Sequence, residues 1–231
     1  MRNEVLYEDN HIIAVNKLPG DIVQADKEND ETLRDVVKQY LKEKYNKPGN
    51  VFCGIVHRLD RPVSGAVLFA RTTKALIRLN NIFRKREVQK FYWAVVDQPP
   101  PEPEGHLVHY LRKNETKNKS YVVGEETKGA LRAELKYRLL GNSDRYYLLE
   151  VELLTGRHHQ IRVQLSSIGC RIKGDLKYGF PRPNPDASIH LHARSIRFVH
   201  PVKKELIELT ARPPDDPLWD FFTEMVTKTE K

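Results

Sequence analysis

Apolar residues alternate with polar ones in two long runs in the second half of the chain, over residues 131–139 and 147–153. A period of two places every apolar side chain on one face of a strand. The sequence Gly-Asn-Ser-Asp between the runs favours a turn. The two runs therefore predict an antiparallel hairpin with one buried face. Shorter apolar runs predict further strands at residues 5–7, 12–15, 66–70, 88–96, 189–193 and 205–209.

Apolar residues at helical spacing predict two helices in the first half, over residues 31–45 and 72–86. Asn29 or Asp30 would cap the first of them. A third helix is predicted to run from Thr155, as its N-cap, to a stop at Gly169, and a fourth near residues 218–222. Strands with a few interspersed helices predict an α+β fold with a mostly antiparallel sheet. The proline-rich segment 99–103 resembles a linker that could separate two halves.

The composition is typical of a soluble globular protein. The chain has 231 residues, of which 39% are hydrophobic and 30% charged. It contains no run of about 18 apolar residues and no apolar signal segment after Met1. Cys53 and Cys170 lack metal-ligand spacing, so we expect a cytoplasmic protein without a disulfide framework. A monomer is the default expectation.

The charge of the chain points to a polyanionic partner. The formal net charge is +8 at pH 7, and a strongly basic balance is most often a sign of nucleic-acid binding. The excess is concentrated, because residues 71–90 hold seven basic residues and one acid, Glu87. A second basic patch covers residues 112–119. Single lysines and arginines often only solubilise a helix face, but this local imbalance favours contact with phosphates.

Residues 56–65, Val-His-Arg-Leu-Asp-Arg-Pro-Val-Ser-Gly, form the motif around which the chain is organised. Asp60 lies between Arg58 and Arg61, and nearby positive charge keeps a carboxylate ionised. An ionised, positioned carboxylate can attack carbon. Pro62 and Gly65 suggest a stiff, shaped loop. Taken by themselves, these ten residues also fit an ordinary ion pair on a surface turn.

Two other motifs follow in order: Lys-Phe-Tyr-Trp-Ala at residues 90–94, and Thr-Gly-Arg-His-His-Gln-Ile-Arg-Val at residues 155–163. Together with the central motif they resemble the RluA-type branch of the RNA pseudouridine synthases. The opening residues 7–20 and the closing residues 191–201 are similar to the same family, so the resemblance covers nearly the whole chain. Several linked motifs in one order are a more specific signal than any of them alone.

The resemblance implies a fold and an activity. It implies one catalytic domain, residues 1–231, whose two antiparallel subdomain halves meet at a cleft around Asp60, with no RNA-binding module in front. It implies isomerisation of uridine to pseudouridine in ribosomal or transfer RNA, with the base flipped out of its stack and with no cofactor or metal. Asp60 would be the nucleophile, Tyr92 would stack on the base, and Arg162 would pair with Asp60.

The remaining predicted site residues contact RNA. By the resemblance, Arg58 takes the place of the extruded nucleotide and holds the loop. The full set of predicted RNA contacts is His57, Arg58, Arg61, Arg71, Lys74, Arg84, Lys85, Arg86, Lys90, Arg157, His159 and Gln160. Residue types leave open whether Asp60 attacks C1′ of the ribose or C6 of the base, or stabilises a glycal-forming step.

Other functions fit the sequence less well. An RNA-binding protein with this fold but without catalysis is the alternative, disfavoured because Asp60, Tyr92 and Arg162 are all present. A glycoside hydrolase would need two carboxylates, and Asp175 is the one other carboxylate in a motif-like loop. A metal site at His158 and His159, with His190 and His192, is disfavoured because no cysteine or carboxylate completes a ligand set. Three positions depart from the family's usual pattern: Val63, His158 and Gln164.

Overall fold

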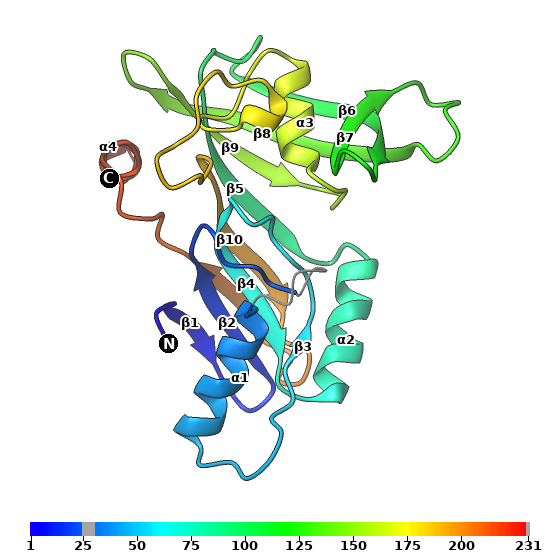
Figure 1. The fold of residues 1–231 in the computed structure, drawn as a ribbon, viewed down its shortest axis with the longest axis vertical. Coiled ribbons are helices and arrows are strands. Elements are labelled where there is room, and N and C mark those ends of the chain that lie inside the picture. Colours follow the sequence, from blue (N-terminus) through cyan, green and yellow to red (C-terminus); the bar gives the residue numbers. More distant parts are fainter. Residues whose placement is uncertain (25–30, 230–231) are drawn as a thin grey trace. The chain divides into compact units, whose positions relative to one another are not determined.

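The structure, a computed structural model, describes residues 1–24 and 31–229. The chain forms two compact units (Figure 1). Unit 1 comprises Met1–Val88 and Ala193–Arg212, and unit 2 comprises Gln89–His192 and Pro213–Lys231. Helices and strands are mixed in both units, and the strand pairings are antiparallel. The predicted α+β fold with a mostly antiparallel sheet is therefore confirmed.

The sheet of unit 1 contains its two predicted N-terminal strands at one edge. The order is β1 (Val5–Glu8), β2 (Ile12–Lys17), β4 (Ser64–Ala70) and β10 (Leu191–Val199). β11 (Leu206–Thr210) pairs with β10, and β3 (Gly54–Ile55) pairs with β4. Every residue of β2 and β4 is buried, which explains why residues 12–15 and 66–70 read as continuous apolar runs rather than alternating ones.

Two helices accompany the sheet of unit 1. α1 (Leu33–Lys44) begins with a capping box in which Thr32 is the N-cap and Asp35 is the reciprocal partner. The predicted caps Asn29 and Asp30 lie outside the described residues. α2 (Thr73–Arg84) is capped by the hydroxyl of Thr72. Ala75 and Leu79 of α2 belong to the same apolar cluster as residues of β2, β4 and β10, so this helix covers one face of the sheet.

The sheet of unit 2 is built on the predicted hairpin. Its order is β5 (Gln89–Val96), β9 (Tyr147–Leu153), β8 (Leu131–Asn142), β6 (Glu104–Asn114) and β7 (Lys119–Val123). β8 and β9 pair from Leu135 with Leu153 to Asn142 with Tyr147, which confirms the hairpin. We did not predict β6 and β7. The prolines at 99–103 join β5 to β6 within unit 2, so the prediction that they could separate two halves was wrong.

The helices of unit 2 cover different parts of its sheet. α3 (Gln160–Ser167) packs Val163 against Leu111 and Ala133. It begins four residues later than predicted, because its N-cap is His159 and not Thr155. A 3₁₀ turn, η1 (Leu176–Tyr178), follows α3, and α4 (Pro217–Thr229) packs against Trp93 and Val95.

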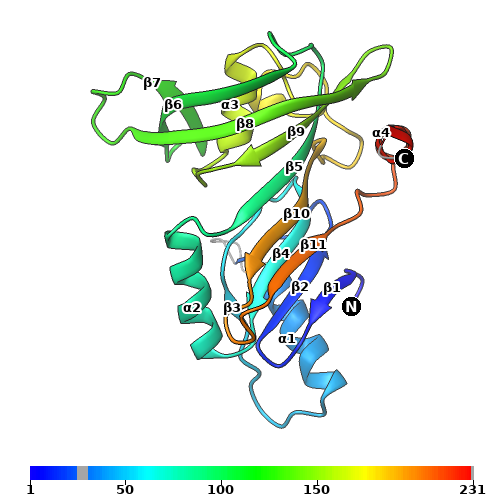
Figure 2. The same ribbon diagram turned by 180° about the vertical axis from the view of Figure 1, so that it is seen from behind.

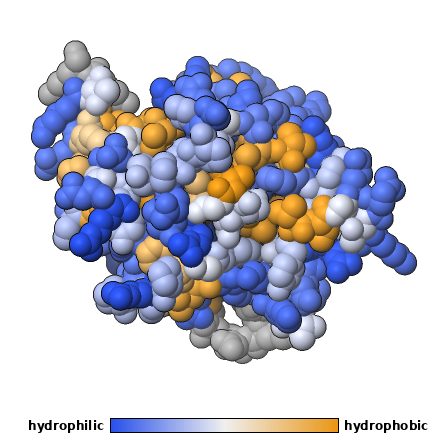
Figure 3. Space-filling view, turned by 90° about the horizontal axis from the view of Figure 1, so that it is seen from above, coloured by the Kyte–Doolittle hydropathy of each residue, from blue (hydrophilic) through white to orange (hydrophobic). Residues whose placement is uncertain are grey.

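Among the described residues, no helix is long and apolar enough to cross a membrane. Figure 3 shows apolar patches separated by hydrophilic surface.

Candidate active site

Asp60 lies on a tight turn in unit 1, directly before β4. The amide of Val63 donates to the carbonyl of Asp60 over 3.1 Å, which closes the turn. Leu59 and Val63 are buried on either side of it, whereas Arg58 and Arg61 are exposed and Asp60 is half-buried. Two apolar anchors thus fix a turn whose polar residues face outward, as the sequence predicted for a stiff, shaped loop.

Lys17, which we did not single out from the sequence, supports this turn from its buried side. It is 0% exposed, and its ammonium donates to the carbonyls of Val63 at 2.6 Å, Arg61 at 3.1 Å and Leu18 at 3.1 Å. Burial lowers the pKa of Lys17 to about 8, and the negative charges of Asp21 and Asp60 partly oppose that shift. One buried cation therefore holds the backbone on both sides of Pro62 and places positive charge near Asp60.

Gly65 has a geometric reason to follow the turn. Its φ is +117°, and a Cβ there would touch the backbone nitrogen and oxygen of Ala193 on β10. A side chain at this position would both strain the backbone and push two strands apart. Val63, two residues before Gly65, is only 2% exposed, so its side chain fills the core beneath the turn.

His57 braces the start of the motif. Its Nε2 accepts a hydrogen bond from the amide of Leu68 on β4 at 3.1 Å, and its ring stacks on Phe83 of α2 with centroids 5.2 Å apart. β3 pairs with Phe69 and Ala70 just beyond Leu68, so the imidazole continues the ladder of β3. Through these contacts His57, which we had predicted as an RNA contact, holds the start of the motif against β4 and α2.

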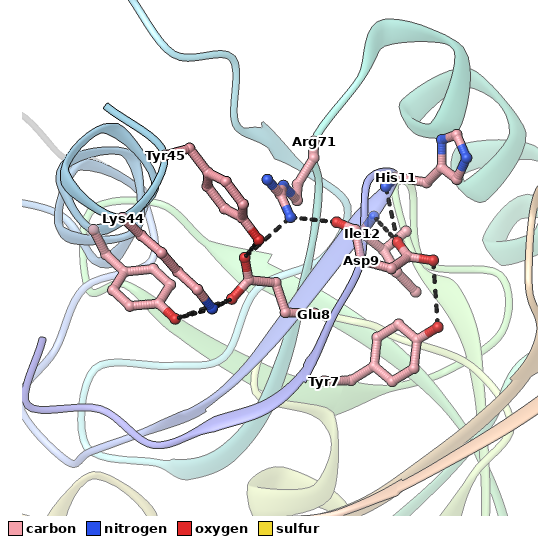
Figure 4. A network of polar contacts seen from close by, with 9 residues as sticks. Tyr7, Glu8, Asp9, His11, Ile12, Lys44, Tyr45 and Arg71 are labelled. Carbon is pink, nitrogen blue, oxygen red and sulfur yellow. Dashed lines mark hydrogen bonds and ion pairs between the residues drawn. The ribbon is translucent and has the colours of Figure 1, made fainter. Parts of the chain in front are cut away.

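Arg71 also points into the protein rather than outward (Figure 4). Its Nη1 donates to Glu8 Oε1 at 3.1 Å and to the carbonyl of Asp9. Glu8 further accepts from Tyr45, Lys44 and Tyr40. Burial raises the pKa of Glu8, but the hydrogen bonds from Lys44 and the two tyrosines outweigh it, so the pKa lies below its usual value. Arg71 therefore joins β1, α1 and the start of α2 in one ionic network.

The other basic residues after the motif divide into two groups. Arg78 donates to the carbonyl of Pro201 at 3.0 Å and belongs to the packing of α2. The exposed ones are Lys74, Arg84, Lys85 and Arg86. Lys90, at the start of β5 in unit 2, is half-buried. The exposed group is the most accessible to phosphates.

Tyr92 lies on β5 in unit 2, opposite Val151 of β9, and is 7% exposed. Because paired residues of an antiparallel sheet share a face, Tyr92 lies on the same face as Tyr137, which is also paired with Val151. The adjacent Trp93 points to the opposite face and packs under α4. The strand therefore fixes the direction of the Tyr92 ring.

Arg162 is buried on α3 and forms a bidentate pair with Asp175. Its Nε lies 2.7 Å from Oδ2 and its Nη2 lies 2.8 Å from Oδ1. The guanidinium also lies over the ring of Tyr178, 5.1 Å from its centroid. Asp175 is 1% exposed. A planar fork with two parallel hydrogen bonds fixes both partners firmly, so Asp175 orients Arg162, a role that the Gly-Asp sequence at residues 174–175 had not revealed.

Hydrogen bonds between Thr155 and Gln160 hold the loop before α3. The Thr155 hydroxyl donates to Gln160 Oε1 at 2.7 Å, and Gln160 Nε2 donates to the carbonyl of Glu134 at 2.9 Å. The amide of Arg157 also donates to Gln160 Oε1. Gln160 is 3% exposed, and its amide shapes the loop. Its contact with RNA stays a prediction.

His158 and His159 stack on each other, with ring centroids 3.7 Å apart. His159 has φ +54°. Burial, with Arg162 and other nearby cations, lowers its pKa to about 2, so the ring is neutral. It contacts the hydroxyl of Tyr178 at 2.9 Å. His158 lies 2.9 Å from the Ser120 hydroxyl and 3.0 Å from Asn118 Oδ1, and thus connects the β6–β7 turn to this loop.

Gln164, the third departure from the family pattern, is fully buried on α3, and its amide donates to the carbonyls of Leu107 and Ala133. No group of three or more His, Cys, Asp or Glu side chains within residues 1–24 and 31–229 is placed to hold a metal ion. Burial raises the thiol pKa of Cys53 to about 12 and of Cys170 to about 11. Both thiols are therefore protonated at neutral pH, and neither resembles an activated nucleophile.

Comparison with known proteins identifies the family. Residues 11–167 match the family model described as RNA pseudouridylate synthase. This span is well over half of the chain and includes Asp60, Tyr92 and Arg162. The chain belongs to the RNA pseudouridylate synthase family. The resemblance noted in the sequence is therefore confirmed, and so is the expected enzyme class, an isomerase that converts uridine to pseudouridine in RNA.

Relatives in this family are similar over most of the chain. The ribosomal large subunit pseudouridine synthase D of Zymomonas mobilis is 31% identical over 223 residues, which cover 92% of this chain and 70% of that protein. The ribosomal large subunit pseudouridine synthase C of Rickettsia bellii is 31% identical, covering 91% and 68%. The solved structure of human RNA pseudouridylate synthase domain containing 4 has a TM-score of 0.77 at 22% identity, covering 96% and 92%. That likeness shows the shared fold.

Proposed function

We propose that this pseudouridylate synthase isomerises specific uridines in ribosomal RNA, with Asp60 as the nucleophile. The relatives named as ribosomal large subunit pseudouridine synthases support ribosomal over transfer RNA as the substrate. The observation that carries the role of Asp60 is its turn, which Lys17 holds through backbone carbonyls on both sides of Pro62. A carboxylate that must attack one carbon atom benefits from a backbone that does not move.

The reaction must break one bond to the base and form another. The bond between N1 of uracil and C1′ of the ribose breaks, the base rotates, and C5 joins C1′. The hydrogen on C5 then leaves as a proton, and N1 takes up a proton. Asp60 either attacks C1′ or C6, or assists a glycal-forming step. No redox partner is needed, because the product is an isomer of the substrate.

Tyr92 and Arg162 complete the proposed site. Tyr92 supplies an aromatic face on which the flipped uracil stacks, and its rigid strand supports that role. Arg162, held in place by Asp175, supplies positive charge for the Asp60 carboxylate. We further propose that Arg58 takes the place of the extruded nucleotide and that Lys85 and Arg86 contact the phosphates of the RNA.

The test is to map pseudouridines in ribosomal and transfer RNA from a strain that lacks this protein. We expect at least one position in ribosomal RNA to lose its pseudouridine, and a gene encoding the unchanged protein to restore it. An Asp60→Asn gene should not restore it. A deletion strain whose ribosomal RNA keeps every pseudouridine would contradict the substrate. Loss of a pseudouridine from transfer RNA instead would identify transfer RNA as the substrate.

A further inference from the structure

The sheet of unit 2 has a bare surface that the proposed active site does not use. Register defines it, because paired residues of neighbouring antiparallel strands share a face. Val108 pairs with Glu134, Tyr110 pairs with both Arg132 and Val123, and Arg112 pairs with Tyr121. We call this surface the outer face; its residues are His106, Val108, Tyr110, Arg112, Tyr121, Val123, Arg132, Glu134 and Lys136.

The two faces of this part of the sheet differ in what covers them. On the inner face, Leu111 and Ala133 are buried beneath Val163 of α3 and Tyr178. On the opposite side α4 packs over Trp93 and Val95 at the β5 end of the sheet. Figure 2 shows β6 and β8 in front with α3 behind them. The outer face over β6, β7 and β8 therefore lies open to solvent.

Apolar and aromatic side chains remain exposed on this face. Val108 is 41% exposed and Tyr121 is 37% exposed, and Tyr110 lies beside them on β6. An antiparallel sheet with one wet face normally carries polar residues there. Two of these side chains are also held in place: the Tyr110 hydroxyl bonds to Glu125, and the Lys119 ammonium lies over the Tyr121 ring, 5.6 Å from its centroid.

Cations surround the two rings. Arg112, Arg132 and Lys136 are exposed on the outer face, and Lys119 lies at its edge. Two acids lie on or beside this face: Glu134, which is paired with Arg132 and lies 3.4 Å from His106, and Glu125, which accepts from the Tyr110 hydroxyl. The charge left over is positive, which favours a polyanion. Aromatic rings on an open sheet, flanked by arginines and lysines, are also how proteins stack and hold unpaired RNA bases.

We propose that the outer face binds a single-stranded segment of the substrate RNA outside the target nucleotide. Bases stack on Tyr110 and Tyr121, and Arg112 contacts the phosphates. This inference rests on the proposed function, because it assigns the face to the RNA that the active site modifies. Tyr92 lies on the opposite face of the same sheet, so the outer face makes its contacts away from the reacting uridine.

The experiment compares two RNAs that contain the same target uridine. One is a short stem-loop, and the other is that stem-loop with unpaired flanks of about ten nucleotides. For the unchanged protein we expect a lower KM with the flanked RNA. Tyr121→Ala should raise the KM for the flanked RNA by about tenfold, because a stacked base is lost. Arg112→Glu should raise this KM by about as much, because a phosphate contact is replaced by repulsion. Neither should change kcat, or the KM for the short RNA.

Matched controls lie elsewhere in unit 2. Phe221 of α4 is 46% exposed, and Arg145 is exposed on the β8–β9 turn. Phe221→Ala and Arg145→Glu should leave both KM values unchanged. Equal KM values for the two RNAs with the unchanged protein would overturn the proposal, and would leave a protein partner as the occupant to consider. Unaltered KM values in Tyr121→Ala and Arg112→Glu would overturn it as well.

A binding measurement separates this inference from the proposed function. Fluorescence anisotropy of a labelled flank oligonucleotide without a target uridine requires no catalysis. We expect Tyr121→Ala and Arg112→Glu to weaken its binding, and Phe221→Ala and Arg145→Glu to leave it unchanged. If the flank binds in this way while no RNA is isomerised, the proposed function fails and the outer face stands. If RNA is isomerised while the flank does not bind, the outer-face proposal fails and the proposed function stands.

Discussion

A buried cation belongs to each of the two parts of the proposed catalytic apparatus, and the two cations have different partners. In unit 1, Lys17 donates to three backbone carbonyls, which are neutral acceptors. In unit 2, Arg162 is bound by the carboxylate of Asp175, which carries a full charge. The lysine thus shapes a backbone turn, whereas the aspartate aims a side chain. The difference fits the proposed roles, because a nucleophile benefits from a fixed main chain and a counter-ion from a fixed direction.

The largest effect should come from breaking the pair in unit 2. Arg162→Met leaves Asp175 buried without its partner, which should lower the free energy of unfolding by about 3–5 kcal/mol. Urea denaturation at pH 7 measures it. A loss below 1 kcal/mol at pH 7 would mean that the pair contributes little to the fold.

The corresponding change in unit 1 should cost less. Lys17→Met leaves neutral carbonyls without a donor, at about 1–3 kcal/mol for each group left unsatisfied. It also removes the cost of burying the ammonium, so we expect a net loss of about 2 kcal/mol. Lys42→Met is the matched control, because Lys42 is exposed on α1 in the same unit. Equal urea midpoints for the two variants would show that Lys17 does not support the turn.

A third change tests the close approach at the end of the turn. Gly65→Ala should destabilise unit 1 by about 2 kcal/mol, through a backbone angle that alanine rarely adopts and through contact with Ala193. Gly129→Ala is the control. It has φ +82° but no atom within 4 Å of the added Cβ, so it reports the cost of the angle alone. The comparison contradicts the account if the control loses as much stability as Gly65→Ala.

The smallest effect is a dependence on pH. Burial favours the neutral amine of Lys17 and lowers its pKa to about 8, so the charge disappears as the pH rises through that value. We expect kcat to fall moderately above pH 8 as the turn loses a charged donor. A profile of kcat from pH 6 to 10 measures this. A rate that stays level to pH 10 would show that the charge of Lys17 does not matter to the turn.

The sequence revealed the parts of the fold that local patterns determine. The β8–β9 hairpin and the helices α1 and α2 followed from periodicity, because each buries one regular face. β6 was missed because its pattern is interrupted by Gly105 and by two histidines at 106 and 109. The start of α3 was misplaced because Thr155 looks like a cap, yet its hydroxyl bonds to Gln160 and to Glu134 of β8. No local pattern shows such a partner.

The candidate site was predictable in its motifs but not in its supports. Asp60, Tyr92 and Arg162 stand in recognisable motifs. Lys17 and Asp175 act through contacts that a linear sequence does not display, 46 residues from Val63 and 13 from Arg162, respectively. Arg71 and Gln160, both predicted RNA contacts, bond to groups within the protein. The sequence does not show whether a polar side chain near a motif binds a ligand or supports the loop.

The central claim is that Asp60 performs the chemistry, and release of tritium from RNA labelled at C5 of uridine tests it most directly. Isomerisation replaces the bond from C5 to hydrogen, so each turnover releases one tritium to water. Asp60→Ala should keep the urea midpoint and the RNA affinity of the unchanged protein and should release no tritium above background. Release at the unchanged rate by a folded Asp60→Ala protein would contradict the account.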